Sequence, residues 1–146
     1  MSSQELGDFL ARERVVNVST LGKDGWPHMT ALWYVMRDGE PWIYTYAKSQ
    51  KVKNLERDDR ATLLVEAGEQ YHELRGVMLK ARAHLHRDIE STAALAEEVF
   101  AKYQGGRQID GATRDALRAQ AAKRVAIRFE VEHTVSWDHS KLGGAY

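Results

Sequence analysis

Three lysines crowd the start of a short predicted helix in the middle of the chain. They flank Ser49, the expected N-cap of that helix, and are Lys48, Lys51 and Lys53. The acidic residues collect at the other end of the helix, at Glu56, Asp58 and Asp59. This order opposes the helix dipole, which favours anions at the N-terminus and cations at the C-terminus, and costs about 0.3–1 kcal/mol per misplaced charge. A bound anion would remove the cost.

The same segment carries the groups that bind phosphate. The first backbone N–H groups of a helix have no intrahelical partner, and together with the Ser49 hydroxyl and the ammonium groups they predict a phosphate site. Gln50 lies between Ser49 and Lys51. A solvated charged helix end would present the same residue types, but the inverted order of the charges favours the bound anion.

Aromatic and hydroxyl side chains lie on neighbouring predicted strands. Tyr44 and Thr45 point to opposite faces of one strand, and His28 and Thr30 share a face of another. Aromatic residues of a core would look similar, yet a planar ligand that carries a phosphate explains both observations. His133 is a titratable group within a strand face that the alternation predicts to be apolar. Tyr44 and His133 are therefore candidates for a proton donor.

Several other kinds of site are excluded or disfavoured. The chain has no cysteine, which excludes thiol nucleophiles, iron–sulfur clusters and cysteine-bound zinc. His84 and His86 share a predicted strand face with Lys80 and Arg82, so we interpret them as solvated side chains and expect no metal site. Lysine plus arginine equals aspartate plus glutamate, at 21 each, and this balance argues against a nucleic-acid partner.

The length and the absence of long apolar runs define the broad class. A chain of 146 residues is typical of one domain, spanning 1–146. The first residues lack the basic and apolar regions of a signal peptide, and no apolar run approaches the ~20 residues that a membrane span needs. We therefore expect a soluble cytoplasmic protein without a membrane partner.

Periodicity predicts a mainly β protein with small helices. A capping box at Ser2 and Glu5 begins the first helix, and Asp-Gly pairs at 24–25 and 38–39 predict hairpins with two-residue turns. The expected strands are 15–21, 28–36, 42–46, 60–66, 76–87 and 125–137, and the later helices are 89–103 and 112–122. In the last strand, the odd-numbered residues from Val125 to Trp137 share one face. Six antiparallel strands predict a closed or partly split β-barrel, because a barrel removes the exposed strand edges of a single open sheet.

The order of these motifs resembles a known family. The turn Asp24-Gly25-Trp26-Pro27-His28, the block Lys51-Val52-Lys53-Asn54-Leu55 and the closing segment 137–144 are similar to those of the flavin split-barrel superfamily. That superfamily includes pyridoxamine 5′-phosphate oxidase and the deazaflavin reductases, which use coenzyme F420. The resemblance implies a six-stranded split barrel that forms a homodimer, with two cofactor sites at its interface.

The resemblance also implies roles for individual residues. Ser49, Lys51 and Lys53 would hold the cofactor phosphate, and Gln50 stands where the oxidase has the arginine of a Ser-Arg-Lys triplet. Strand residues and a late tryptophan would surround the ring: His28, Thr30, Tyr44, Thr45 and Trp137. Lys23 and Lys48 would meet the acidic tail of coenzyme F420.

These features predict a reductase in which reduced coenzyme F420 gives a hydride to an electron-poor small molecule. The cofactor supplies the chemistry, while the protein binds, orients and excludes water. One alternative is an oxidoreductase of the pyridoxamine phosphate oxidase type that uses flavin mononucleotide (FMN), although the absence of the arginine weakens it. Another is a dimer that binds F420 or a flavin without turnover.

Overall fold

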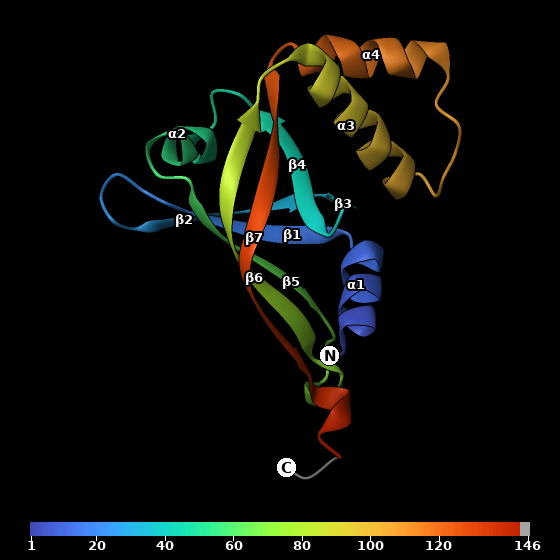
Figure 1. Ribbon diagram of the computed structural model, residues 1–146. Helices are drawn as coiled ribbons and strands as arrows, with labels where there is room; N and C mark the ends of the chain where they lie inside the picture. Colours follow the sequence, from blue (N-terminus) through green and yellow to red (C-terminus); the bar gives the residue numbers. More distant parts are fainter. Residues whose placement is uncertain (144–146) are drawn as a thin grey trace.

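The structure is a computed structural model, which describes residues 1–143 of the chain. Within these residues, seven strands form one curled antiparallel sheet in the order β2-β1-β5-β6-β7-β4-β3 (Figure 1). The strands are β1 (Val15–Leu21), β2 (Pro27–Trp33), β3 (Val35–Arg37), β4 (Glu40–Tyr46), β5 (Arg60–Ala67), β6 (Arg75–His86) and β7 (Arg124–Asp138). The helices are α1 (Ser3–Arg12), α2 (Gln50–Arg57), α3 (Ile89–Tyr103) and α4 (Gly111–Ala121), with the short 3-10 turns η1 (Tyr71–Glu73) and η2 (His139–Lys141).

The strand predicted over 28–36 is broken at Tyr34, so the prediction of six strands is wrong by one. Tyr34 is fully buried, and its hydroxyl donates a hydrogen bond to the carbonyl of Leu10 at 2.5 Å. Lys102 ties the same corner to α3 by donating to the carbonyl of Tyr34 at 3.2 Å. The apolar pattern of the segment continues through this corner without glycine or proline, and the break therefore left no signal in the sequence.

The break at Tyr34 explains the shape of the sheet. β2 and β3 lie at opposite edges of the sheet, yet a single residue joins them, so the sheet must curl until its two edges converge. β3 pairs only with Glu40–Trp42 at the start of β4, while residues 43–46 pair with β7 on their other side. β2 pairs with β1. Within residues 1–143, the edges of β2 and of the second half of β4 therefore have no neighbouring strand, and this gap is the split of the barrel.

Buried apolar side chains fill the inside of the curled sheet. They come from α1, α2 and the strands β1, β4, β5, β6 and β7, and include Phe9, Val16, Val18, Ile43, Val52, Leu63, Val77, Ile127 and Phe129. A second, smaller cluster lies between α3 and the outer face of β4 and β7, and contains Val35, Leu95, Val99 and Ala126. α2 contacts β1 and β2, and its Val52 and Leu55 are buried in the main core as predicted.

β7 contains a bulge, after which its side chains point to the opposite faces of the sheet from those expected by simple alternation. Lys80 of β6 pairs with His133, but the next residue, Ala81, pairs with Val131, so Glu132 is an extra residue. An extra residue shifts the alternation of side chains by one position. The predicted apolar face is therefore correct for Val125 to Val131 and wrong beyond it, because His133, Val135 and Trp137 face the outside of the sheet.

The local signals of the sequence differ in how well they predicted turns and caps. The capping box of α1 is present, with Ser2 and Glu5 in reciprocal hydrogen bonds. Asp38 and Gly39 both have positive φ, of 51° and 81°, in the expected two-residue turn. The first hairpin has a longer loop, in which the Gly22 N–H donates to the Trp26 carbonyl at 2.9 Å. Among residues 1–143, no helix has the length and apolar character needed to span a bilayer.

Candidate functional site

Lys51 is a buried cation beside the split of the barrel. It is only 6% exposed, and its ammonium group donates a hydrogen bond to the hydroxyl of Thr45 on β4 at 3.1 Å. Burial lowers the pKa of Lys51. An ammonium group has three donors and a high cost of desolvation, and none of the ion pairs among residues 1–143 includes Lys51. The site therefore holds a positive charge that a bound anion would neutralise.

Ser49 precedes Lys51 as the N-cap of α2, but its hydroxyl does not cap the helix. A serine at this position usually accepts a hydrogen bond from the second or third N–H of the helix. Here the Oγ atom is buried and has no partner within the described chain. Buried hydroxyls are rarely left unpaired, so the unused oxygen at the helix N-terminus is a second indication of a ligand at this position.

β2 contributes two further unpaired polar atoms. His28 and Thr30 pair with Thr20 and Val18 of β1, whose side chains are buried, and they therefore face the inside of the sheet. Nδ1 of His28 and Oγ1 of Thr30 are buried without a hydrogen-bond partner in residues 1–143. Both residues lie on the strand with the free edge. The structure thus places unused polar groups on β2 and at the start of α2, which contacts β2.

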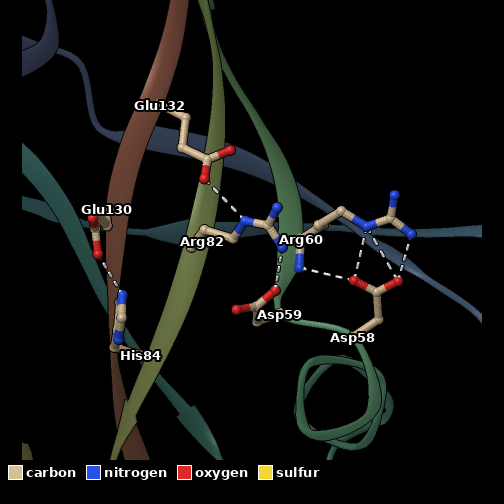
Figure 2. Close-up of polar contacts among 7 residues, drawn as sticks. All are labelled: Asp58, Asp59, Arg60, Arg82, His84, Glu130 and Glu132. Atoms are coloured by element: carbon tan, nitrogen blue, oxygen red, sulfur yellow. Dashed lines mark hydrogen bonds and ion pairs between the residues drawn. The ribbon is translucent and has the colours of Figure 1, made fainter.

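The acidic residues at the far end of α2 already have other partners. Figure 2 shows Asp58 paired with Arg60, at 2.7 Å, and Asp59 paired with Arg82, at 2.8 Å. The hydrogen bond from Arg60 lowers the pKa of Asp58 to about 2. Glu56 pairs with Arg87 at 3.0 Å. The carboxylates at the end of the helix are therefore engaged by arginines and do not neutralise the lysines at its start.

A cavity of about 530 Å³ lies between the β1–β2 hairpin and α2. Its lining includes Lys23, His28 and Gln50 of the predicted site. Asn54, also at the cavity, is fully buried, and its Nδ2 donates to the hydroxyl of Thr20 at 3.0 Å. Sequence reasoning gave Asn54 no role. An amide between the buried Val52 and Leu55 was the available signal, and the structure shows that it fixes α2 against β1.

Two other predicted lysines surround the start of α2 from the solvent side. Lys48 is exposed one residue before Ser49, and Lys53 is exposed within the helix. Neither lysine appears among the ion pairs formed within residues 1–143. Together with Lys51, they leave a concentration of positive charge at this end of α2.

Three predicted residues lie elsewhere. Tyr44 is on the opposite face of β4 from Thr45, in the cluster under α3, with the Arg124 guanidinium 5.3 Å from its ring centre. Trp137 pairs with Gly76 at the far end of β7 from Val125, the residue that pairs with Thr45. His133 is exposed on the outer face of the sheet, so its predicted place in an apolar face is wrong, because the bulge turns it outward. The last residue of the motif 137–144, Gly144, is outside the described residues.

The two histidines of β6 have different surroundings, and Nε2 of His86 is buried without a hydrogen-bond partner in residues 1–143. Nε2 of His84 lies 2.7 Å from a carboxylate oxygen of Glu130 (Figure 2), and the ring of His86 packs against Trp42 with 5.0 Å between ring centres. Within the described residues, no group of three or more histidine, cysteine, aspartate or glutamate side chains is arranged to hold a metal ion.

Several solved structures have the same fold as this chain. A conserved hypothetical protein from Mycobacterium tuberculosis is 39% identical, with a TM-score of 0.91 and coverage of 100% of this chain and 90% of that chain. An F420 reductase is 19% identical, with a TM-score of 0.68 and coverage of 88% and 94%. An FAD-binding protein from Mesorhizobium loti is 18% identical, with a TM-score of 0.69 and coverage of 93% and 94%. The last two likenesses show the fold alone.

Sequence comparison identifies the family directly. No curated protein matches the chain significantly. The family model described as pyridoxamine 5′-phosphate oxidase matches residues 2–138, which is nearly the whole chain, and the curled antiparallel sheet has the fold of that family. The chain therefore belongs to the pyridoxamine 5′-phosphate oxidase-like family of flavin split barrels.

Proposed function

We propose that this protein is an oxidoreductase that binds coenzyme F420 and uses it to reduce an electron-poor organic compound. The main support is the buried ammonium group of Lys51, whose one hydrogen-bond partner within residues 1–143 is the hydroxyl of Thr45. A buried cation is costly unless an anion lies beside it. A phosphate fits this place, because it offers anionic oxygens to Lys51 and a partner to the unused hydroxyl of Ser49. Reduced F420 supplies a hydride when bound.

The residues around Lys51 have separate tasks in this proposal. Lys53 adds a second positive charge to the phosphate site, beside the side chain of Gln50. Thr30 and Thr45 position the ring between the free edges of β2 and β4, where the backbone of β2 from His28 to Leu32 offers hydrogen-bonding groups. Water protonates the product in this proposal, since Tyr44 and His133 of the chain that holds the cofactor both lie on the outer side of the sheet.

The choice of F420 over FMN rests on lysines outside the phosphate site, which would bind the acidic tail of F420. Coenzyme F420 ends in an acidic tail, and Lys23 and Lys48 are exposed cations near the start of α2. Gln50 takes the place of the arginine that would favour FMN. Salt weakens such exposed charge interactions, so tail binding predicts an affinity that falls as salt is added.

A second copy of the chain completes the site in this proposal. Met29, Trp33 and Val135 are 63%, 53% and 40% exposed, and the strand pairing places all three on the outer face of the sheet. We call the outer surface of β1, β2, β5, β6 and the second half of β7, on which these three side chains are exposed, the outer face. Large exposed apolar patches favour association, and folds of this family commonly dimerise. Trp137 lies on the same face, so a partner chain could bring its own Trp137 toward the cofactor.

Titration of the purified protein with F420 and with FMN tests the proposal. The four tryptophans provide a fluorescence signal. We expect tighter binding of F420, which salt and Lys23→Ala both weaken, and oxidation of bound reduced F420 when an acceptor is added. Tighter binding of FMN than of F420 would contradict the choice of F420 and favour an FMN-dependent oxidoreductase. Tight F420 binding without oxidation by any acceptor would make the protein a carrier.

A further inference from the structure

Asn54 is a buried polar residue of α2 whose side chain hydrogen-bonds in two directions. It is 0% exposed. Its Nδ2 atom donates to the hydroxyl of Thr20 at 3.0 Å. Its Oδ1 atom accepts from Nε2 of Gln50 at 2.9 Å and from the guanidinium of Arg57 at 3.4 Å. Burial of an amide costs free energy that its hydrogen bonds only offset, so an asparagine on the buried face of a helix needs a reason other than packing.

Arg57 fixes the direction of these hydrogen bonds. A guanidinium group can only donate, so the atom of Asn54 that it reaches must be the amide oxygen. The amide nitrogen of Asn54 then faces Thr20, and Gln50 can pair with the same oxygen only through its own nitrogen. Arg57 also donates to the backbone carbonyl of Leu21. Two side chains of α2 therefore hold two consecutive residues of β1.

α2 depends on this attachment because its own start is not capped. The helix has eight residues, and a helix of this length has little stability by itself. The hydroxyl of Ser49 makes no capping hydrogen bond, so the place of the first turn depends on contacts with the sheet. Thr20 of β1 pairs with His28 of β2. A helix that is held to Thr20 is therefore also held at a fixed place relative to β2.

We propose that Asn54 is a positioning residue for the cofactor, which sets the place of the phosphate site at the start of α2 relative to the edge of β2. The inference rests on the proposed function, in which one cofactor reaches both places at once. Gln50 lies one helical turn before Asn54, and the same amide keeps its side chain in one place beside Lys51. Asn54 needs no contact with the phosphate, because it acts through α2 and Gln50. A site that is ordered in advance binds with a lower entropic cost.

Thr20→Val tests the inference without any change to α2. Thr20 is buried, and valine keeps its shape but leaves Nδ2 of Asn54 without its acceptor. We expect the Kd for F420, measured by tryptophan fluorescence, to rise about threefold to tenfold, which corresponds to the loss of one hydrogen bond. Thr20→Ser keeps the hydroxyl and should bind F420 as the native protein does. Without cofactor, the side-chain amide signals of Gln50 in a 1H–15N NMR spectrum should move in Thr20→Val.

Val77→Ala is the matched control for a general loss of stability. Val77 is fully buried on β6, where it pairs with Val65 and Ser136, and its truncation leaves a cavity in the core. The urea midpoint should fall in this variant, while the F420 affinity and the Gln50 signals stay as in the native protein. Unchanged F420 affinity in Thr20→Val would overturn the inference, as would an equal loss of affinity in Val77→Ala.

The Gln50 signals separate this inference from the proposed function. If they do not move in Thr20→Val, the positioning role of Asn54 is wrong, whether or not F420 binds. Failure of the native protein to bind F420 would instead contradict the proposed function. In that case FMN, which also carries a phosphate, takes the place of F420 in the same comparison of Thr20→Val with Val77→Ala, and equal FMN affinities would overturn the positioning role.

Discussion

The ammonium group of Lys51 donates to the hydroxyl of Thr45 at 3.1 Å and joins the start of α2 to β4. The contact links a buried cation to a neutral oxygen, whereas Asp58 and Asp59 beyond the same helix are paired with arginines. The charge at the start of α2 is therefore left for a ligand. The order of charges in the sequence, with lysines at the start of the helix and acidic residues at its end, agrees with an anion site at the start of α2.

Val135→Asp tests whether the outer face is an interface. Because Val135 lies next to Met78 across the strand pair, a carboxylate there should be buried without a partner in a dimer, and we expect dissociation into monomers. Sedimentation velocity measures the change. Ile89→Asp is the matched control, since Ile89 is similarly exposed, at 44%, but begins α3 away from this face. A protein that sediments as a monomer before any substitution would contradict the dimer.

Gly76→Ala tests the packing of Trp137. A Cβ atom at Gly76 would lie 2.8 Å from Cη2 of the indole and closer still to Cζ2, so the ring must move. We expect a loss of about 1–3 kcal/mol in the free energy of unfolding, typical of overpacking, and a changed near-ultraviolet circular dichroism spectrum. Gly7→Ala, in α1 with open space around it, should be neutral or slightly stabilising. An unchanged stability for Gly76→Ala would show that Trp137 does not cover this glycine.

Glu5 should contribute to stability in a defined range of pH. Its carboxylate accepts from Lys141 at 2.7 Å, and this hydrogen bond, with that from Ser2, lowers the pKa of Glu5 to about 2. A lowered pKa stabilises the folded state above the unfolded value, near 4.5, and the benefit is lost as the pH falls toward 2. In urea denaturation, the advantage of the native protein over Glu5→Gln should shrink across this range. Asp8→Asn removes another carboxylate of α1, and a similar trend for it would contradict the assignment.

Patterns that are local in the sequence predicted local structure well. α3 has the predicted bounds of 89–103, and β1 those of 15–21, because capping residues and alternation decide such elements over a few residues. The break at Tyr34 could not be predicted in the same way. A buried hydrogen bond to Leu10 and contacts from α3 hold it, and these partners are distant in the sequence.

The candidate site shows the same division. The lysines and Ser49 are neighbours in the chain, so their order alone pointed to an anion. The bulge at Glu132 depends on the pairing of β7 with β6, and no residue type in the sequence marks it. The predicted orientation of His133 was therefore wrong. The unpaired atoms of His28 and Thr30 could not be predicted from the sequence, because the hydrogen-bond partners of a buried atom depend on the side chains that surround it in the folded chain.

Lys51→Met tests whether the buried ammonium group binds the cofactor phosphate. The substitution keeps an unbranched side chain of similar size and removes its charge, so F420 should bind about tenfold to a hundredfold more weakly, as expected when a charged hydrogen-bonding group is lost. Because the buried cation has no counter-ion within the described residues, thermal stability without cofactor should stay the same or rise. Arg107→Met, in the exposed loop between α3 and α4, controls for net charge and should bind F420 as the native protein does. Unchanged affinity in Lys51→Met would contradict the assignment of Lys51 to the cofactor phosphate.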